Sequence, residues 1–248
     1  MDELFPQPAS GIDPAPRYEA DERPAHPNRP WLLVNMIASI DGAAQVAGRS
    51  GGLGTPADRA VFTTLRGLAD VVLAGAGTVR AEGYGPPRTP EALQARRVER
   101  GQAPYPRIAI LSGRLDLDLS APLFTDTPTQ PIVITTSAVA ADRRAAAAEV
   151  AEVIEAGDTH VDVAHALATL REGGAASVTC EGGPTLNAAL LEADLVDEWC
   201  LSLSPTLTVG TAMRGTNGTT ILQRDFRLDR VLAEDGLLLL RYVRLPRQ

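Results

Sequence analysis

The sequence predicts an α/β fold in which helices flank a mostly parallel central sheet. Short runs that are apolar on both faces, as in strands buried within a parallel sheet, alternate with stretches of helical periodicity. Glycine-rich turns follow two of these runs directly, which is typical of the strand–turn–helix units that build such sheets. The parallel connections are therefore expected to be right-handed crossovers within a single domain.

The domain is expected over residues 30–248, after an N-terminal segment of different character. Residues 1–29 are Pro-rich, acidic and poor in apolar side chains, so we expect an extended arm, either disordered or draped over the body. The arm has no apolar run of the signal-peptide kind, and no stretch reaches the ~18 apolar residues of a membrane span, so a cytoplasmic protein is expected.

The expected elements follow in order along the domain. Thr55 suits the N-cap of the first helix, Pro56 its first position, and Asp58 the positive end of its dipole. A polar connection covers residues 83–106, and its Arg-rich run at 95–100 is expected to be a solvated helix face. Strands are expected at 31–38, 70–74, 107–112, 131–136, 177–180, 196–205 and 237–245, and further helices at 138–151, 161–171 and 185–193.

Composition excludes several classes of protein. Hydrophobic residues make up 44% and charged residues 22% of the 248, and the formal charge of −8 argues against a dedicated nucleic-acid or membrane-surface binder. All 23 basic residues are Arg, which excludes a phosphate-loop NTPase and any Lys Schiff-base mechanism. Cys180 and Cys200 lie in separate hydrophobic segments and are expected to be reduced core residues. No Cys or His spacing fits a zinc site, so no metal is expected.

Two glycine turns are the strongest candidates for a binding site. Gly75 and Gly77, followed by Thr78, come after one strand, and Gly182 and Gly183 come after another. Without a Cβ, such turns let a phosphate approach the backbone, and a following helix N-terminus supplies free N–H groups. Two such turns at neighbouring strand ends would bracket one dinucleotide. The alternative is that each is a plain tight turn, since neither matches the GxGxxG fingerprint.

Two carboxylates, Asp41 and Glu181, each follow a predicted strand. Asp41 follows the first strand and could accept hydrogen bonds from a pyrimidine or pterin, or merely close a turn with Gly42. Glu181 precedes the second glycine turn and is either a polar anchor for substrate or a charge at a helix N-terminus. For Asp41 we expect a role in orienting the substrate and in relaying a proton through water.

Several motifs occur in an order that resembles one enzyme family. They are Asn-Met-Ile-Ala-Ser-Ile-Asp-Gly at 35–42, Thr-Pro at 55–56, Val-Leu-Ala-Gly-Ala-Gly-Thr at 72–78, Glu-Gly-Gly-Pro-Thr-Leu at 181–186 and Leu-Val-Asp-Glu at 195–198. Over residues 30–245 the chain resembles the riboflavin-pathway pyrimidine reductases. This resemblance implies a dihydrofolate-reductase-like fold, a homodimer, and NADPH-dependent reduction of the ribosyl ring of an aminouracil phosphate to a ribityl chain. The zinc signature of the family's deaminase partner is absent, so a free-standing reductase is expected.

The resemblance also implies roles for single residues. Gly75, Gly77, Thr78, Gly182, Gly183, Pro184 and Thr185 would hold the coenzyme's phosphates and ribose, and Thr55 would lie at the nicotinamide side. Ser112 and Arg114 follow a strand where a 2′-phosphate could be read, because an Arg fork binds phosphate through two nitrogens. Asp41 and Glu181 would be catalytic and, with Asn35 and Arg59, would face the substrate.

The sequence departs from the family pattern on the substrate side. The family often has Lys where this chain has Asn35, and residues 81–86, which include Glu82, Gly83 and Tyr84, replace an acidic-Pro-x-Leu-Thr stretch that helps bind the sugar phosphate. Two further hypotheses therefore stand beside the first: a pterin or dihydrofolate reductase on the same scaffold, and a protein that binds NADPH without turnover.

Overall fold

The computed structural model describes residues 1–245, and residues 246–248 of the predicted domain lie outside this described part. The described residues form an α/β structure whose strands are mostly parallel, which confirms the predicted class. The strands are β1 (Asp2–Phe5), β2 (Trp31–Ser39), β3 (Val71–Gly75), β4 (Arg107–Leu111), β5 (Ile132–Thr135), β6 (Glu152–Glu155), β7 (Ser177–Cys180), β8 (Glu198–Ser204), β9 (Phe226–Glu234) and β10 (Leu237–Arg244). The helices are α1 (Pro14–Glu19), the 3-10 turn η1 (Ser50–Gly52), α2 (Pro56–Leu68), α3 (Ala76–Glu82), α4 (Glu91–Glu99), α5 (Pro122–Thr125), α6 (Ala141–Ala148), α7 (Val163–Glu172) and α8 (Pro184–Glu192).

The chain divides into two compact units, which we call the first unit (residues 1–22, 32–65 and 180 onward) and the second unit (23–31 and 66–179). In the first unit the strand order is β1-β9-β10-β8-β2, and only the β8–β2 pair is parallel. Helix α2 packs inward through Val61 and Leu65, and α8 buries Leu186 and Leu190.

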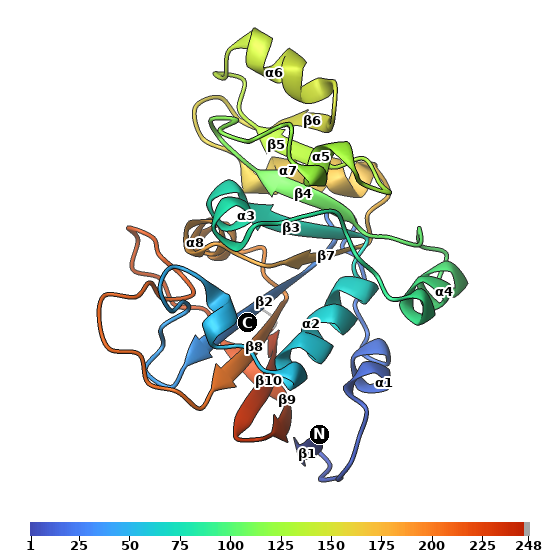
Figure 1. Cartoon of the computed structure of the whole chain (residues 1–248), viewed down its shortest axis with the longest axis vertical. Coiled ribbons are helices and arrows are strands. Elements are labelled where there is room, and N and C mark those ends of the chain that lie inside the picture. The colour runs from blue at the N-terminus through green and yellow to red at the C-terminus, as the bar shows by residue number, and fades with distance from the viewer. Residues whose placement is uncertain (246–248) are drawn as a thin grey trace. The chain divides into compact units, whose positions relative to one another are not determined.

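The second unit is a parallel sheet with its own core. Its strand order is β7-β3-β4-β5-β6, and the registers from β3 to β6 are all parallel. Helix α3 packs on β3 and β4, while α6 and α7 pack against β6 (Figure 1). The core between these layers is built from aliphatic side chains that include Val72, Ile108, Ile110, Val133 and Leu123.

The N-terminal segment is more regular than the expected extended arm. Strand β1 pairs with β9, and the ammonium group of Met1 lies 3.0 Å from a carboxylate oxygen of Glu234. Helix α1 begins after Asp13, whose carboxylate accepts a hydrogen bond from the Ala15 N–H. Composition missed both elements because Pro-rich, polar segments lack the apolar periodicity from which elements are predicted, whereas pairing with an existing strand stabilises them here. Strands β6 and β9 were likewise not expected.

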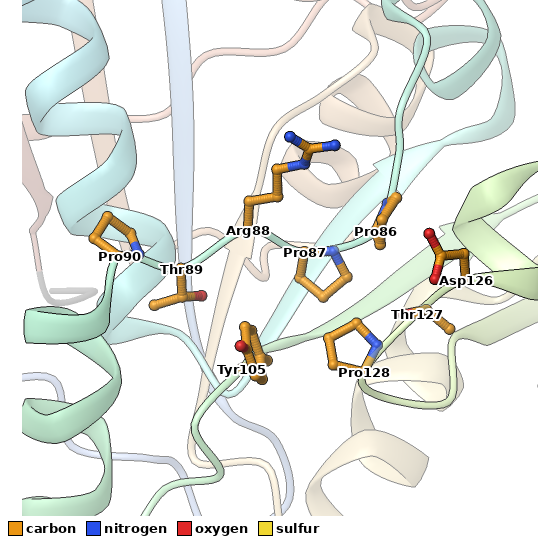
Figure 2. A pocket seen from close by; sticks show the side chains of 9 residues that line it. All are labelled: Pro86, Pro87, Arg88, Thr89, Pro90, Tyr105, Asp126, Thr127 and Pro128. Atoms are coloured by element: carbon orange, nitrogen blue, oxygen red, sulfur yellow. The ribbon is translucent and has the colours of Figure 1, made fainter.

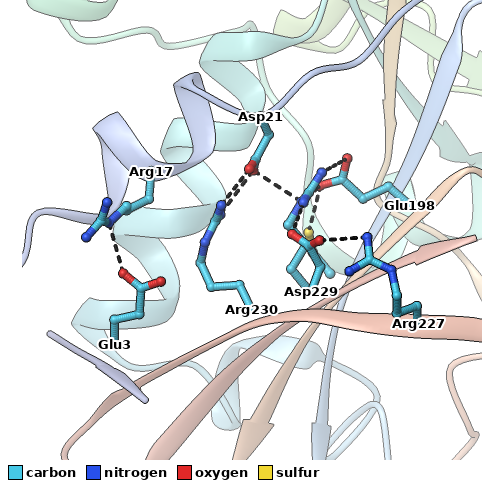
Figure 3. A network of polar contacts seen from close by, with 9 residues as sticks. Glu3, Arg17, Asp21, Glu198, Arg227, Asp229 and Arg230 are labelled. Atoms are coloured by element: carbon cyan, nitrogen blue, oxygen red, sulfur yellow. Dashed lines mark hydrogen bonds and ion pairs between the residues drawn. The ribbon is translucent and has the colours of Figure 1, made fainter. Parts of the chain in front are cut away.

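A buried ionic network fixes the end of this segment to the C-terminal strands (Figure 3). Asp21 binds Arg230 through both carboxylate oxygens, at 2.5 and 3.0 Å, and lies 3.2 Å from the guanidinium of Arg241. Arg241 also donates to Glu198 at 2.8 Å, and the Arg230 guanidinium lies over the ring of Tyr18. The neighbouring carboxylates raise the pKa of both guanidinium groups against the effect of burial, so they stay charged.

One prediction about the Arg-rich run was wrong. The run does lie on a helix, α4, but Arg97 is 1% exposed and donates hydrogen bonds to the carbonyl oxygens of Gly67, Ala69 and Ala103. Arg100 adds a bond of 2.7 Å to the Gly67 oxygen. Two of these carbonyls terminate helix α2, whose last carbonyls have no partner within the helix. Arg97 is therefore an internal cap for α2 and not a solvated side chain.

Candidate functional site

The turn after β2 holds Asp41 in a defined position in the first unit. One carboxylate oxygen of Asp41 accepts hydrogen bonds from the Ser39 hydroxyl at 2.7 Å and from the Thr208 N–H at 2.9 Å. These bonds, that from Thr208 foremost, lower the pKa of the Asp41 carboxyl below its ordinary value. The side chain is exposed at the carboxyl end of β2, and it links the 39–43 turn to the loop that follows β8.

The first turn of α2 carries three polar side chains in the same unit. Thr55 caps the helix as predicted, since its hydroxyl accepts a bond of 3.3 Å from the Asp58 N–H. The Asp58 carboxyl is half-buried and hydrogen-bonds to the buried Ser202 of β8. Arg59 is exposed beside it. On β2, Asn35 pairs in register with Cys200, two residues before Ser202 on β8, so Asn35 and Ser202 share the sheet face that α2 covers.

The second glycine turn is supported from behind by a buried amide. Gly182 has φ +86°, and a Cβ there would lie 3.2 Å from the Met36 sulfur and 3.4 Å from Nδ2 of Asn187. The Asn187 amide is fully buried and donates to the Gly215 oxygen at 2.8 Å. Gly183 is the N-cap of α8 without a side-chain cap, Pro184 begins the helix, and Thr185 follows it. Sequence reasoning missed Asn187, whose only signal was its place one turn into the helix after the glycines.

Glu181, which precedes this turn, is 8% exposed. Burial raises the pKa of the neighbouring Cys180 thiol to about 12, and the charge of Glu181 acts in the same direction. Cys180 and Cys200 are both buried and form no disulfide, as predicted.

In the second unit, the first glycine turn has the predicted strand–turn–helix form. Gly75 ends β3 and is the N-cap of α3, and a Cβ built on Gly77 would meet no atom within 4 Å. The helix ends at Gly83, and the Tyr84 ring that follows lies under the guanidinium of Arg66. This stacking occupies part of the 81–86 segment that departs from the family pattern.

The residues expected at the 2′-phosphate, Ser112 and Arg114, lie directly after the carboxyl end of β4. Ser112 is buried and its N–H donates to the Ile134 oxygen, so it extends the sheet beyond β4. Arg114 is exposed two residues later, and its carbonyl oxygen accepts a bond of 3.1 Å from the guanidinium of Arg143. The exposed guanidinium of Arg143 thus lies against the backbone of Arg114, and Arg143 was not singled out from the sequence because it lies in an Ala-rich helix.

Each unit contains a cavity. A shallow cavity of about 730 Å³ in the second unit is walled by prolines and by Tyr105, Arg88 and Asp126 (Figure 2). Its lining residues at 105 and 126–128 precede β4 and β5, so it lies at the strand ends opposite to Gly77 and Ser112. A cavity of about 490 Å³ in the first unit is lined by α8, β8, β10 and the 216–226 segment.

Within residues 1–245, the acidic, His and Cys side chains form no group of three or more that could hold a metal ion. The helices of this same stretch include none that is both long and apolar enough to cross a membrane.

Comparison with known proteins gives concordant matches. The family model described as the RibD C-terminal domain matches residues 30–236. The 2,5-diamino-6-ribosylamino-4(3H)-pyrimidinone 5′-phosphate reductase of Archaeoglobus fulgidus is 28% identical over 171 residues, which cover 68% of this chain and 78% of that protein. The reductase of the same name from Methanothermobacter thermautotrophicus is 27% identical over 186 residues, covering 75% and 82%.

Solved structures agree with the sequence matches. A pyrimidine reductase-like protein from Corynebacterium diphtheriae superposes with a TM-score of 0.82 at 28% identity, covering 89% of this chain and 94% of that one. A riboflavin biosynthesis reductase from Saccharomyces cerevisiae has a TM-score of 0.67 over 93% and 95% at 17% identity, which shows the fold alone. The predicted dihydrofolate-reductase-like α/β fold is thereby confirmed.

Proposed function

Because the chain belongs to the RibD C-terminal domain family, we propose that it is an NADPH-dependent reductase of an aminopyrimidine that carries a ribosylamino phosphate, of the 5-amino-6-(5-phosphoribosylamino)uracil type. The family match over residues 30–236 carries the proposal, and two archaeal relatives are named as reductases of such a compound. The bound coenzyme supplies a hydride from C4 of its nicotinamide, and the protein binds and orients both partners.

The two glycine turns fit a dinucleotide phosphate chemically. At Gly77 the space that a Cβ would fill is open, so a phosphate can approach the backbone there. The first turn of α8 follows the uncapped Gly183 and presents N–H groups with the positive end of the helix dipole. We propose that Gly75, Gly77 and Thr78 bind one part of the coenzyme and that the 182–185 turn binds another, with Thr55 toward the nicotinamide.

Arg114 and Arg143 support the choice of NADPH over NADH. A guanidinium group matches the charge and the bidentate geometry of a 2′-phosphate, a group that NADH lacks, and the Arg143 guanidinium lies against the Arg114 backbone. We therefore expect Arg114→Ala to weaken NADPH binding about tenfold or more and to leave NADH binding within about twofold, as measured by quenching of protein fluorescence. Equal losses for the two coenzymes would remove the 2′-phosphate from this position.

Asp41 and Glu181, with Asn35 and Arg59, are proposed to face the substrate. For Asp41 we keep the expected role of orienting the substrate and drop that of relaying a proton, because its lowered pKa keeps the carboxyl ionised at neutral pH. An ionised carboxylate accepts hydrogen bonds from ring N–H groups and orients the substrate, but it is a poor source of protons.

The decisive experiment follows the absorbance of NADPH at 340 nm with three substrates in parallel: the aminopyrimidine ribosylamino phosphate, dihydrofolate and a dihydropterin. The proposal expects turnover with the aminopyrimidine at a kcat/KM at least tenfold above that for the others. Preference for dihydrofolate would instead support the pterin hypothesis, which the departures at Asn35 and Tyr84 motivate. Tight NADPH binding without oxidation of any of them would support a non-catalytic protein.

A matched pair of glycine variants tests the coenzyme turn itself. Gly77→Ala places a methyl group in open space without a positive φ, so the free energy of unfolding should change little. If phosphate approaches the backbone there, the Kd for NADPH should rise about tenfold or more. Gly85→Ala, which also meets no atom within 4 Å, is the control and should bind NADPH as the parent does. Unchanged affinity in Gly77→Ala would refute the assignment.

We propose in addition that the protein is a homodimer through the half-exposed face of β8 and β10. Trp199, Leu201, Phe226 and Tyr242 line the 490 Å³ cavity on this face, an apolar surface of the kind that interfaces bury. Light scattering after gel filtration should give a dimer, and Trp199→Glu should give a monomer. Val98→Glu, at an exposed apolar position of α4, should remain dimeric. A monomeric parent protein would refute the proposal.

A further inference from the structure

In the first helical turn of α2, the Asp58 side chain makes a contact that the helix itself does not require. A carboxylate in a first helical turn is stabilised by the helix dipole in water and needs no further contact. Here the Asp58 carboxyl reaches β8 and hydrogen-bonds to the hydroxyl of Ser202, which is 3% exposed. The Oδ2 atom of Asp58 also lies close to Gly54, since a Cβ added to that glycine would come within 3.2 Å of it.

This carboxyl–hydroxyl pair lies on the face of β2 and β8 that carries the proposed substrate residues. Ser202 pairs in register with Ile37, midway between Asn35 and Ser39 on β2. Paired residues of parallel strands point to the same side of the sheet, so Asn35, Ser202 and the Asp58 carboxyl share one side. Gly54 and Arg59 border the pair from the connection to α2 and from α2 itself. No bulky side chain at position 54 separates Asp58 from that space.

The proposed reaction needs a proton at a definite atom. When a ribosylamine opens to an imine, its ring C–O bond breaks and the proton of its N–H group passes to the ring oxygen. Hydride addition to the carbon of the C=N bond then sends the π electron pair to nitrogen. The nitrogen must gain one proton for the secondary amine to form, while the dihydronicotinamide is oxidised to the pyridinium. Asp41 is exposed and its pKa is lowered, so it is ionised and is a poor source of this proton, and a different acid is needed.

We propose that Asp58 is this proton donor, and that the Ser202 hydroxyl holds its carboxyl toward the nitrogen of the C=N bond being reduced. The inference rests on the proposed reductase function and deepens it. In the balanced step, the O–H bond of the Asp58 carboxyl breaks as the N–H bond of the product forms. The Asp58 carboxylate is then reprotonated from solvent after the product leaves.

The environment of Asp58 favours the acid form. Burial raises the pKa of its carboxyl, and the opposing effects of the Ser202 hydroxyl and of the adjacent Arg59 charge are smaller. Asp41, by contrast, has a lowered pKa. Two carboxyl groups whose pKa values are displaced in opposite directions are the usual arrangement where one acts as an acid and the other stays ionised.

Three variants separate this role from a structural one. Asp58→Asn keeps the size and hydrogen-bonding capacity of the side chain but has no proton to give, so kcat with the aminopyrimidine substrate should fall about 100-fold or more. The Kd for NADPH and the melting temperature should stay close to those of the parent. Asp58→Glu should recover part of the lost kcat. Glu91→Gln, at an exposed first-turn acid of α4, is the control and should have the parent's kcat.

The pH profile gives the signature that a purely structural residue would not produce. In the parent, kcat/KM should fall as pH rises through the raised pKa of Asp58, whereas Asp58→Asn should lack this limb. If the wild-type protein turns over the aminopyrimidine and Asp58→Asn keeps a kcat within about threefold of it, or keeps the same fall of kcat/KM with pH, the role of Asp58 is refuted. The proposed reductase function would still stand in that case. If the wild-type protein oxidises NADPH with none of the three substrates, the proposed function fails and the inference falls with it.

Discussion

Replacement of Arg97 should test how the end of helix α2 is held. The Arg97 guanidinium donates to the carbonyl oxygens of Ala103 at 2.8 Å, Gly67 at 3.2 Å and Ala69 at 2.5 Å, all in the second unit. In Arg97→Ala the carbonyls of Ala69 and Ala103 lose this donor, while the Gly67 oxygen keeps its bond from Arg100, and a side chain that was 1% exposed leaves a cavity. Both losses act in the same direction.

The magnitude follows from competing effects. A hydrogen bond from a charged donor contributes ~1.5–3 kcal/mol, but the three bonds share one group and do not add. Burial lowers the pKa of Arg97 to about 10, so holding its charge inside the protein opposes part of this gain. We therefore expect Arg97→Ala to reduce the free energy of unfolding by about 3 kcal/mol, within the range for a disrupted buried polar network.

Guanidinium chloride unfolding followed by circular dichroism measures this loss. The midpoint should fall in Arg97→Ala with little change in the slope, since the folded surface is otherwise preserved. Arg100→Ala is the matched control on the same stretch. It removes one exposed side chain's bond to the Gly67 oxygen and should cost less than about 1 kcal/mol. Equal losses in the two variants, or none in Arg97→Ala, would refute the capping argument.

Three further predictions concern the first unit. Arg241→Met should lower the free energy of unfolding by ~3–5 kcal/mol because it leaves buried carboxylates without their partner, whereas removal of the exposed Arg227 should cost ~1 kcal/mol or less in the same unfolding assay. In a carbon-13 NMR titration, the Asp41 carboxyl should titrate below the ordinary pKa of an aspartate and the Asp58 carboxyl above it. The hydrogen bond from the Thr208 N–H to Asp41 should be lost as pH falls through the Asp41 pKa. Coincident titrations of the two carboxyl groups would contradict both pKa shifts. Cys180, with its pKa raised to about 12, should not react with a thiol reagent at pH 8 until the protein unfolds, and rapid labelling of the native protein would refute its burial.

Local signals in the sequence predicted the parts of the fold that local physics determines. Thr55 and Pro56 begin α2 because a hydroxyl cap and a fixed φ favour a helix start in any context. Gly75 and Gly183 are the N-caps of α3 and α8 for the same kind of reason. These features need only neighbouring residues, so the glycine-turn candidates were visible before the fold was known.

Local signals could not predict which residues of β8 are buried. Its alternation places Trp199 and Leu201 on the half-exposed face and Glu198 and Ser202 on the buried one, the reverse of the usual strand pattern. The reversal is stable because each buried polar group has a distant partner. Glu198 pairs with Arg241, and Ser202 bonds to Asp58. The same reasoning explains Arg97, since its acceptors are carbonyls that no side-chain pattern reveals.

The family motifs themselves divide into residues that hold the backbone and residues that are free for chemistry. In the Leu-Val-Asp-Glu motif, Asp197 accepts a bond of 2.8 Å from the Leu32 N–H and so fixes the start of β2 to β8. Asp70 does the same at the start of β7, accepting from the N–H groups of Ala176 and Ser177. Such carboxylates are fully used by the fold, and a matching motif does not make them part of a site.

Asp58 shows the converse case. Its position in a first helical turn already has a sufficient local explanation in the helix dipole, and for that reason sequence reasoning gave it no chemical role. Only the contact with Ser202, which lies far along the chain, reveals that the carboxyl is turned toward the sheet face that Asn35 shares. A residue whose local role is satisfied and which still makes a buried long-range contact has a second function to explain. For Asp58, that function is the delivery of a proton.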